Sequence, residues 1–562
     1  MLAVLYACWE SSWLVRQIES FAHWLVAVFR GWWPARWLDR EWDDQPPHLA
    51  TSRLAQIGRS LGQWLTRLRL PADWLVTSWF LAVLPHWLVS DLTWVWETSL
   101  LGRLWRKFWA VFYIDKSLED TSDAPAPPIW RLSSYLLAGG LLVWVFLSFE
   151  WGRSLLLLAG AAVTLLLIWG RPDWGLYLVV ALIPLVPALI NVALILFSLL
   201  ARLLQGKLRL PQRSLLAFWG GLFCLTLLLS ALNSRLVLAA LHSWSYQLAG
   251  LLLFLQLPAV VRDRTALNRL LALALTIGIL VSGLGIWQYF GGMPAKVAWV
   301  DLRYSSTAVR VVGSFDNPNV FGVYLIALLA FAVSQFLARE GKWLSRLLAA
   351  LVSSVLGLAL IMTFSRGAWL GAIAIAIVLV ASLQPKLFWL LPPALLVLPL
   401  IVPEAIWNRL LSAGNLNDSS IKLRFYIWGS SLRMFRDNWL TGIGPGYEPF
   451  ALHYPPYRFE AVHAIHAHNL PLQQAVEGGV PGLGAFALLA IGLVRACLSR
   501  RQGMDALSAG VLAALIGHLV YGLFDYAWYG NRLLLLFWLL AALALITWRR
   551  RPRPLPSEEK PC

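Results

Sequence analysis

Three histidines stand close together in one polar segment of an otherwise apolar chain. His463, His466 and His468 are followed directly by Asn469 and further on by Glu477. A neutral imidazole is a suitable general base near pH 7, so the pattern predicts proton abstraction, with His468 and His466 as the candidates. Capping of the apolar helix that follows is an alternative use. No HExxH pattern, neighbouring cysteine or acidic cluster accompanies the histidines, so we predict no metal.

Three arginines in separate segments are candidates for binding an anion. Arg310 precedes the sequence VVGSFDNPN, whose Asn-Pro pair predicts a turn that opens a helix near Asn319. Arg366 lies in a minimal connection between two apolar stretches, where it either extends to the membrane surface or faces a polar cavity. Arg424 lies on an amphipathic helix, where a solvated face is the alternative. Several guanidinium groups facing one cavity would suit a phosphate or diphosphate.

A glycine-rich turn, Gly442-Ile-Gly-Pro-Gly446, lies between Arg424 and the histidines and is centred on Gly444. It lacks the lysine of a nucleotide-binding loop and does not follow a strand, so we predict a tight turn rather than a nucleotide site. The four cysteines are scattered and have neither metal-binding nor disulfide spacing. We therefore expect no cofactor.

The elements that must position these residues are membrane spans. The 562 residues are 59% hydrophobic and 13% charged, whereas about a quarter of the residues of a soluble protein are charged. Continuous apolar runs of about 17–22 residues can each cross a hydrocarbon core of about 30 Å. The sequence predicts an all-α polytopic membrane protein with about 12–14 transmembrane helices. We expect these spans near 133–149, 154–170, 174–201, 214–231, 247–261, 269–290, 319–337, 346–364, 367–382, 387–402, 479–498, 506–524 and 532–547.

Lysine and arginine are concentrated in alternate loops, which predicts that those loops are cytoplasmic. This topology accounts for the net charge of +17, so we expect no binding to nucleic acid. The basic tail 549–562 is placed in the cytoplasm, and the protein in the plasma membrane. The connections on the opposite, periplasmic side are 232–246, 292–318, 365–366, 403–467 and 525–531.

The chain divides into an extension, a linker and two groups of spans. Residues 1–117 are tryptophan-rich and amphipathic, which is typical of helices at the membrane interface, and docking of a protein partner is the alternative. A proline-rich linker at 118–130 precedes N-terminal spans at 131–212 and a larger membrane domain at 213–548. Pro184 and Pro187 interrupt the expected span 174–201. One continuous helix there would place the extension outside, and a split at the prolines would place it in the cytoplasm.

The motifs resemble a known family when they are taken in order. Arg310 with GSFDNPN, then FSRGAWLG, then Arg424 with DNWLTGIGPGY, and then HAHNLPLQQAVEGGVPG are similar to the O-antigen ligase/polymerase superfamily over about residues 220–547. Within that superfamily the chain resembles cyanobacterial proteins labelled inorganic-carbon (bicarbonate) transporters. For the ligases, the resemblance implies transfer of a glycan from a polyprenyl-diphosphate carrier to an acceptor hydroxyl on the periplasmic face, without metal or nucleotide.

The resemblance also implies roles for particular residues. Arg366 and Arg424 would hold the diphosphate, with Arg310 as a third candidate that, like Asn319, could instead shape the cavity. His468 would take the proton from the acceptor hydroxyl, and His466 is the weaker candidate. The remaining cavity-shaping residues would be Asn469, Gly444 and Glu477. The implied partners are membrane lipid, a lipid-linked glycan donor and a glycan or lipid acceptor.

Two other functions remain open. A transporter would have inverted repeats and broken helices that bind the solute near the middle of the membrane. The sequence has no evident internal repeat, and the break at Pro184 and Pro187 is the feature that favours this hypothesis. A scaffold or regulator of carbon uptake would instead dock through residues 1–117.

Overall fold

The computed structural model describes the chain from residue 150 to residue 549 with seven internal gaps. The described ranges are 150–208, 214–291, 310–338, 343–390, 406–407, 419–459, 462–499 and 504–549. The extension 1–117, the linker, the expected span 133–149 and the tail beyond residue 549 lie outside them, as does most of the expected span 387–402. Within these ranges the regular elements are helices, with no strand, which confirms the all-α prediction.

Eight described helices are long and apolar enough to cross a membrane, which confirms a multi-pass membrane protein. They are α12 (Leu215–Leu232), α13 (Val237–Val260), α14 (Arg264–Phe290), α15 (Pro318–Leu337), α16 (Trp343–Met362), α17 (Arg366–Leu383), α22 (Leu470–Leu498) and α24 (Asn531–Arg549). The helices with shorter apolar segments are α9 (Glu150–Gly170), α10 (Asp173–Leu182), α11 (Ala188–Leu204) and α23 (Ala506–Gly522).

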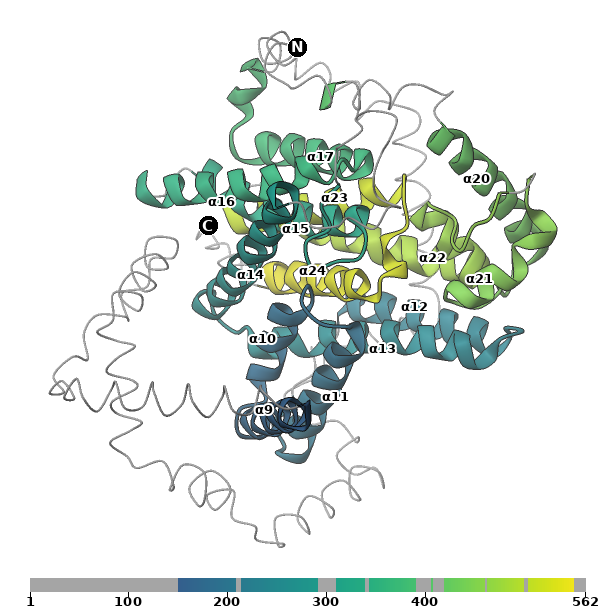
Figure 1. Cartoon of the computed structure of the whole chain (residues 1–562), viewed down its shortest axis with the longest axis horizontal. Coiled ribbons are helices and arrows are strands. Elements are labelled where there is room, and N and C mark those ends of the chain that lie inside the picture. The colour runs from purple at the N-terminus through teal and green to yellow at the C-terminus, as the bar shows by residue number, and fades with distance from the viewer. Residues whose placement is uncertain are drawn as a thin grey trace, which may run out of the picture. The chain divides into compact units, whose positions relative to one another are not determined.

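Helices α15 and α24 form the centre of the bundle (Figure 1). The apolar window of α24 is 83% buried and that of α15 is 72% buried, whereas that of α16 is only 28% buried. Small residues let neighbouring helices approach closely: a Cβ on Gly250 of α13 would overlap the Trp538 ring of α24, and Gly371 of α17 meets Gly517 of α23. Packing of this kind, rather than apolar transfer from water, holds helices together in lipid.

The connections between the spans meet at two opposite ends of the bundle. At one end, Arg264 at the start of α14 lies 3.8 Å from Asp505 before α23. At the other end, Arg310 donates to the carbonyl of Thr363, and Asn319 donates to Asp525. The described parts of the connections assigned to the periplasmic side therefore come together, at what we call the site end. Which end faces the cytoplasm stays a prediction.

The expected span 174–201 is two antiparallel helices. Arg202 at the end of α11 pairs with Asp173 at the start of α10, so the two helices form a hairpin. The turn between them lies at the site end, where the Pro184 carbonyl accepts hydrogen bonds from Ser314 Oγ at 2.6 Å and from Arg532 at 3.1 Å. The prolines therefore split the stretch. The cytoplasmic placement of the extension, which would follow from this split, stays a prediction.

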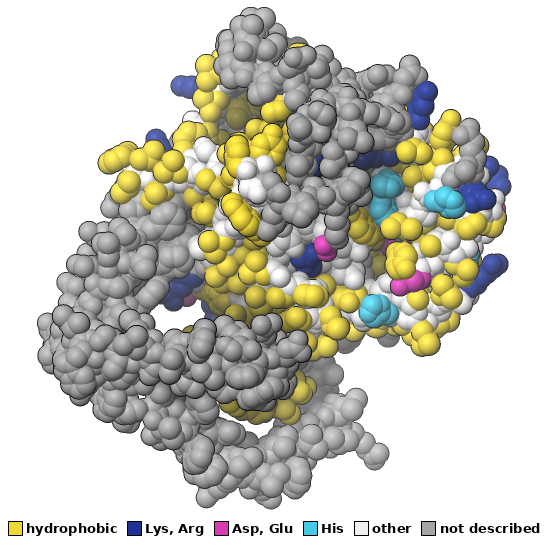
Figure 2. All heavy atoms as spheres, viewed as in Figure 1, with side chains coloured by type: hydrophobic (Ala, Val, Ile, Leu, Met, Phe, Trp, Pro, Cys, Tyr) yellow, Lys and Arg dark blue, Asp and Glu magenta, His cyan; other side chains and the backbone are white. Residues whose placement is uncertain are grey.

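The polar segment between α17 and α22 contains α20 (Ser419–Asp437), α21 (Tyr447–His453) and the 3-10 turn η6 (Pro455–Tyr457). These elements have a small apolar core of their own, which continues into α22. Its buried residues are Ile427, Met434, Ile443, Phe450, Tyr454, Ala467 and Val476. Figure 2 shows histidine and basic side chains gathered over α20 to α22, while hydrophobic side chains cover much of the rest of the described surface on this face.

The glycine-rich turn docks against a kink in α22. Gly479 has φ +64° and ψ −164° inside this helix, and the amide of Val480 donates to the Trp439 carbonyl at 2.7 Å. In the turn itself Gly442 has φ +68°, and a Cβ there would lie 2.2 Å from the Glu477 carbonyl oxygen. Only glycine tolerates both this backbone conformation and this close approach. The segment is thus a tight turn, as expected, and it holds the polar segment against α22.

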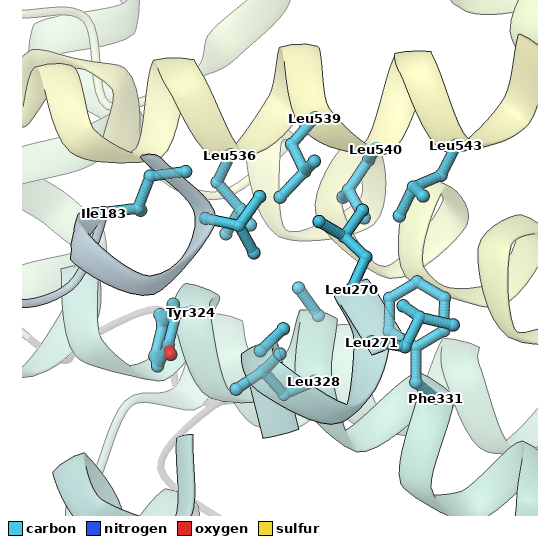
Figure 3. A pocket seen from close by; sticks show the side chains of 13 residues that line it. Ile183, Leu270, Leu271, Tyr324, Leu328, Phe331, Leu536, Leu539, Leu540 and Leu543 are labelled. Atoms are coloured by element: carbon cyan, nitrogen blue, oxygen red, sulfur yellow. The ribbon is translucent and has the colours of Figure 1, made fainter. Parts of the chain in front are cut away.

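An apolar cavity lies between α10, α14, α15 and α24 (Figure 3). Leucine side chains of α14 and α24 form much of its wall, and no charged residue lines it. The Tyr324 hydroxyl is its only polar side-chain group among the lining residues. Such a cavity has room for about one water molecule and offers nothing to bind a phosphate or to move a proton. The residues that can do chemistry lie elsewhere, at the site end.

Candidate functional site

A buried carboxylate joins the segments of the site end. Asp525, in the connection between α23 and α24, is 4% exposed. Its Oδ1 lies 2.9 Å from His468 Nδ1 and accepts a hydrogen bond from the Tyr526 amide. Its Oδ2 accepts a hydrogen bond from Asn319 Nδ2 at 3.1 Å and lies 3.6 Å from Arg424 Nη2. Three candidate residues from three separate segments therefore converge on a residue that we did not single out from the sequence.

The charge state of this carboxylate fixes the tautomer of His468. Burial alone would raise the pKa of Asp525, but the hydrogen bond from His468 and the charges of His468 and Arg424 outweigh burial, and the pKa lies below its usual range. Asp525 is then ionised and can only accept hydrogen bonds. His468 Nδ1 must therefore carry the proton, which leaves Nε2 as the proton acceptor of the imidazole.

The backbone of His468 is in the left-handed region, with φ +49°. A non-glycine residue in this conformation costs on the order of 1–3 kcal/mol and needs support from its surroundings. Trp428 Nε1 donates to the His468 carbonyl at 3.3 Å, and the His468 amide donates to His466 Nδ1 at 3.3 Å. Directly after it, Asn469 caps α22 by accepting from the Leu472 amide at 2.9 Å. The strained residue is thus held on both sides.

The two histidine candidates differ in access. His466 is 5% exposed and stacks on Tyr529, with ring centroids 4.8 Å apart and an interplanar angle of 11°. Burial and the nearby charge of His468 lower the pKa of His466 to about 3, so it is neutral near pH 7. The His468 side chain is 31% exposed. Of the two imidazoles, His468 is therefore the one that a substrate can reach.

The three arginine candidates take different positions. Arg424 lies beside Asp525, whereas Arg310 lies behind Asn319: it donates to Asn319 Oδ1 at 2.8 Å and to the Thr363 carbonyl at 2.9 Å. With its oxygen turned to Arg310, the Asn319 amide turns its NH2 group to Asp525. Arg310 and Asn319 therefore orient the carboxylate.

Arg366 is the first residue of α17, at the same end of the bundle. Its neighbour Gly367 packs closely against the ring of Tyr521 and lies next to Phe524. Both belong to the segment that ends at Asp525. The start of α17 is therefore adjacent to the connection that contains Asp525.

Glu477 and Gly444 have structural positions. Glu477 is 1% exposed, and its Oε1 accepts hydrogen bonds from the Gly446 amide at 3.1 Å and from Gln473 Nε2 at 2.9 Å. Gln473 Oε1 in turn accepts from the Ala467 amide at 2.7 Å. The Gly444 amide donates to Ser230 Oγ at 3.0 Å. This network ties the glycine-rich turn and the histidine segment to the same helix.

Sequence reasoning missed Asp525, Gln473 and Tyr529. The available signal for Asp525 was a lone acidic residue in FDYAWYGNR, a short connection between two apolar helices. A charge in such a place is costly unless it is paired. No charged partner for this carboxylate lies near it in the sequence, whereas the fold pairs it with His468 and Arg424 from distant segments. No acidic cluster accompanies the histidines in the sequence, but the fold brings a carboxylate to them. Donor atoms of His466, His468 and Asp525 all lie within 4.8 Å of one another.

The fold and the site define the class of this protein. It is a multi-pass helical membrane protein that carries an imidazole, a carboxylate and a guanidinium group at one end of its bundle. Residues 347–487 match the family of the O-Antigen ligase, so this part of the chain is similar to the O-antigen ligase superfamily. The matched segment contains Arg366, Arg424, His466 and His468; Asp525 lies beyond it. The curated proteins compared with the chain include no match. The likeness to inorganic-carbon transporters therefore stays a prediction.

Proposed function

We propose that this protein transfers a glycan from a polyprenyl-diphosphate carrier to an acceptor hydroxyl at the site end of the bundle. The observation that carries the proposal is the His468–Asp525 pair beside Arg424, in a membrane protein whose residues 347–487 match the O-antigen ligase family. The site end would face the periplasm, across the plasma membrane from the C-terminus. The partners would be membrane lipid, the lipid-linked donor and a glycan or lipid acceptor.

The proton would move to His468. Its Nε2 takes the proton of the acceptor hydroxyl while the hydroxyl oxygen forms a bond to the anomeric carbon of the donor glycan. The bond between that carbon and the diphosphate oxygen breaks, and polyprenyl diphosphate leaves with the bonding electrons. The imidazolium that results is stabilised by Asp525, whose Oδ1 lies 2.9 Å from Nδ1. A positioned base of this kind contributes about 10²–10⁴-fold to the rate.

The arginines would receive the leaving group. The side chain of Arg424 is 25% exposed, and its Nη2 lies 3.6 Å from Asp525 Oδ2. Negative charge grows on the diphosphate as the bond breaks, and fixed cations stabilise that charge more in the transition state than in the bound substrate. Because Asp525 offsets part of the charge of Arg424, a second cation is required, and Arg366 at the start of α17 is the candidate.

The transporter hypothesis gains no support from the break between α10 and α11. A solute site in a broken helix needs exposed backbone groups near the middle of the membrane. The Pro184 carbonyl instead accepts hydrogen bonds from Ser314 and Arg532, and Ser314 belongs to the segment that opens α15. The break therefore docks the hairpin onto the site end.

The test uses His468→Ala and Arg424→Ala in membranes that contain the full chain. We expect His468→Ala to lower glycan transfer by about 10²–10⁴-fold with the donor still bound, and Arg424→Ala to weaken donor binding as well. Matched controls are His463→Ala, an exposed histidine of the same segment, and Arg436→Ala, an exposed arginine of the same helix. Bicarbonate uptake is measured in parallel. Normal transfer in both site variants, or a loss of uptake with transfer intact, contradicts the proposal.

A further inference from the structure

His466, His468 and Asp525 bring two imidazoles and one carboxylate to one point. Two nitrogen donors and one oxygen donor form a usual three-residue donor set for zinc, with at least one coordination position left open. We propose that this trio binds a divalent transition-metal ion of the zinc class, and that the bound ion prevents proton abstraction by His468. Binding itself follows from the donor geometry alone; only its inhibitory effect rests on the proposed function.

The donor atoms are already near the separations that a metal requires. Ligands on a tetrahedral zinc ion with bonds of about 2.0–2.2 Å lie about 3.3–3.5 Å from each other. His468 Nδ1 and Asp525 Oδ1 are 2.9 Å apart, and the largest separation among the three donors is within 4.8 Å. The rings of His466 and His468 have centroids 4.1 Å apart. Side-chain rotations that move the donor atoms by about 1 Å would bring all three to the separations of a zinc site. The ion would replace the proton that lies between His468 Nδ1 and Asp525 Oδ1.

The surroundings fix two of the three ligands. Stacking on Tyr529 holds the ring of His466, and Asn319 holds the second oxygen of Asp525. Groups that hold ligands in this way reduce the entropy lost on metal binding and are a regular part of metal sites. His468 is partly exposed, so an ion can enter from its side.

Arg424 gives the site a signature of its own. Its Nη2 lies 3.6 Å from Asp525 Oδ2, so a dication on the other oxygen would lie close to a guanidinium. Repulsion between the two cations weakens metal binding, and the loss of Arg424 should therefore strengthen it by at least about tenfold. Adventitious binding to surface histidines would show no such response. The metal ion and the guanidinium group of Arg424 therefore compete for the negative charge of Asp525.

The experiment titrates Zn²⁺ and Co²⁺ into the purified full chain, without an affinity tag of histidines, in lipid nanodiscs. Calorimetry gives the stoichiometry and the dissociation constant, and the visible absorption of Co²⁺ reports nitrogen and oxygen coordination. We expect one equivalent to bind, His466→Ala and Asp525→Asn each to weaken binding by at least about tenfold, and His463→Ala to leave it unchanged. Arg424→Met should strengthen binding. Gel filtration and thermal melting select the variants that are folded.

Several outcomes would overturn the proposal. The first is that no binding event is weakened by His466→Ala and Asp525→Asn. The second is that His463→Ala weakens metal binding as much as these variants do. The third is that Arg424→Met does not strengthen metal binding. Because these measurements need no turnover, they are separate from a failure of the proposed function. Where glycan transfer is measurable, Zn²⁺ at its dissociation constant should halve the rate, and chelation should restore it. Transfer that continues with the site saturated would refute the inhibitory part and leave the metal site standing.

Discussion

Replacement of Asp525 by asparagine removes a charge while keeping the shape of the side chain. Each carboxylate oxygen of Asp525 now serves donors: Oδ1 faces His468 and the Tyr526 amide, and Oδ2 faces Asn319 and Arg424. An asparagine has only one acceptor oxygen, and its NH2 group must take the other position. The NH2 group can face either His468 or the Asn319 side. In each orientation it meets another donor, unless His468 changes its tautomer.

The expected loss follows from these two choices. If the NH2 group faces His468, Nδ1 must accept, the proton moves to Nε2, and the base is lost, which costs up to about 10⁴-fold in a catalytic histidine. If it faces Asn319 and Arg424, the hydrogen bond from Asn319 to a charged oxygen, worth about 1.5–3 kcal/mol, and the ion pair with Arg424 are lost. We therefore expect kcat for glycan transfer to fall by about 10²–10⁴-fold, with a smaller change in KM for the lipid-linked donor.

The assay compares Asp525→Asn with Asp437→Asn, which changes an exposed carboxylate at the end of α20. Transfer is followed by the release of polyprenyl diphosphate in membranes with equal amounts of folded protein. Asp437→Asn should retain the parental rate. If folded Asp525→Asn keeps kcat within about threefold, Asp525 does not set the tautomer of His468, and the reasoning from charge and hydrogen bonding is refuted.

Two further predictions concern stability. Gly442→Ala should lower the free energy of unfolding by at least about 2 kcal/mol, because it adds left-handed strain and places a Cβ 2.2 Å from the Glu477 carbonyl oxygen. Thermal melting in detergent measures this loss. The control is Gly484→Ala, which has nothing within 4 Å of its Cβ and should be neutral or slightly stabilising. Acidification in metal-free buffer should destabilise the protein through His466, whose pKa of about 3 lies below that of an unfolded histidine. Between pH 6.5 and 3 the unfolded chain binds a proton that the folded chain does not, so stability falls by up to about 1.4 kcal/mol per pH unit. His466→Phe keeps a ring beside Tyr529 and should remove this part of the pH dependence; an unchanged slope would show that His466 is not buried and neutral.

The membrane fold was largely predictable because hydropathy over a span depends on local composition. The boundaries that were wrong have a common cause. Helix α13 begins at Val237 rather than near 247, and α22 begins at Leu470 rather than near 479. Polar residues such as Ser243 and Glu477 lower the hydropathy of these first turns. In the fold, Gly446 approaches Ser243 closely and donates to Glu477, so the polar turns are continuous helix stabilised by the glycine-rich turn.

The site was predictable as a set of residues but not as an arrangement. His468, Arg424 and Asn319 could be selected because each has an unusual type or position within its own segment. Their common partner could not, since nothing near Asp525 in sequence indicates that a histidine 57 residues away donates to it. Which histidine is accessible was equally hidden, because the burial of His466 results from Tyr529, beyond the next two spans. Local patterns give side-chain chemistry, and only packing gives burial and pairing.

The position of Asp525 explains why several separate connections must meet at one end of the bundle. A carboxylate that is 4% exposed and remains ionised needs donors on both oxygens. Asn319 at the start of α15, Arg424 on α20 and His468 before α22 supply them, and Arg310 fixes the amide of Asn319 from behind. Loss of any one donor leaves the others to share a charge that the interior does not solvate. The same arrangement that holds the imidazole in one tautomer therefore also fastens α15, α20 and α22 together, so we expect variants of these residues to change stability and transfer in parallel, whereas Arg436→Ala on the exposed side of α20 should change neither.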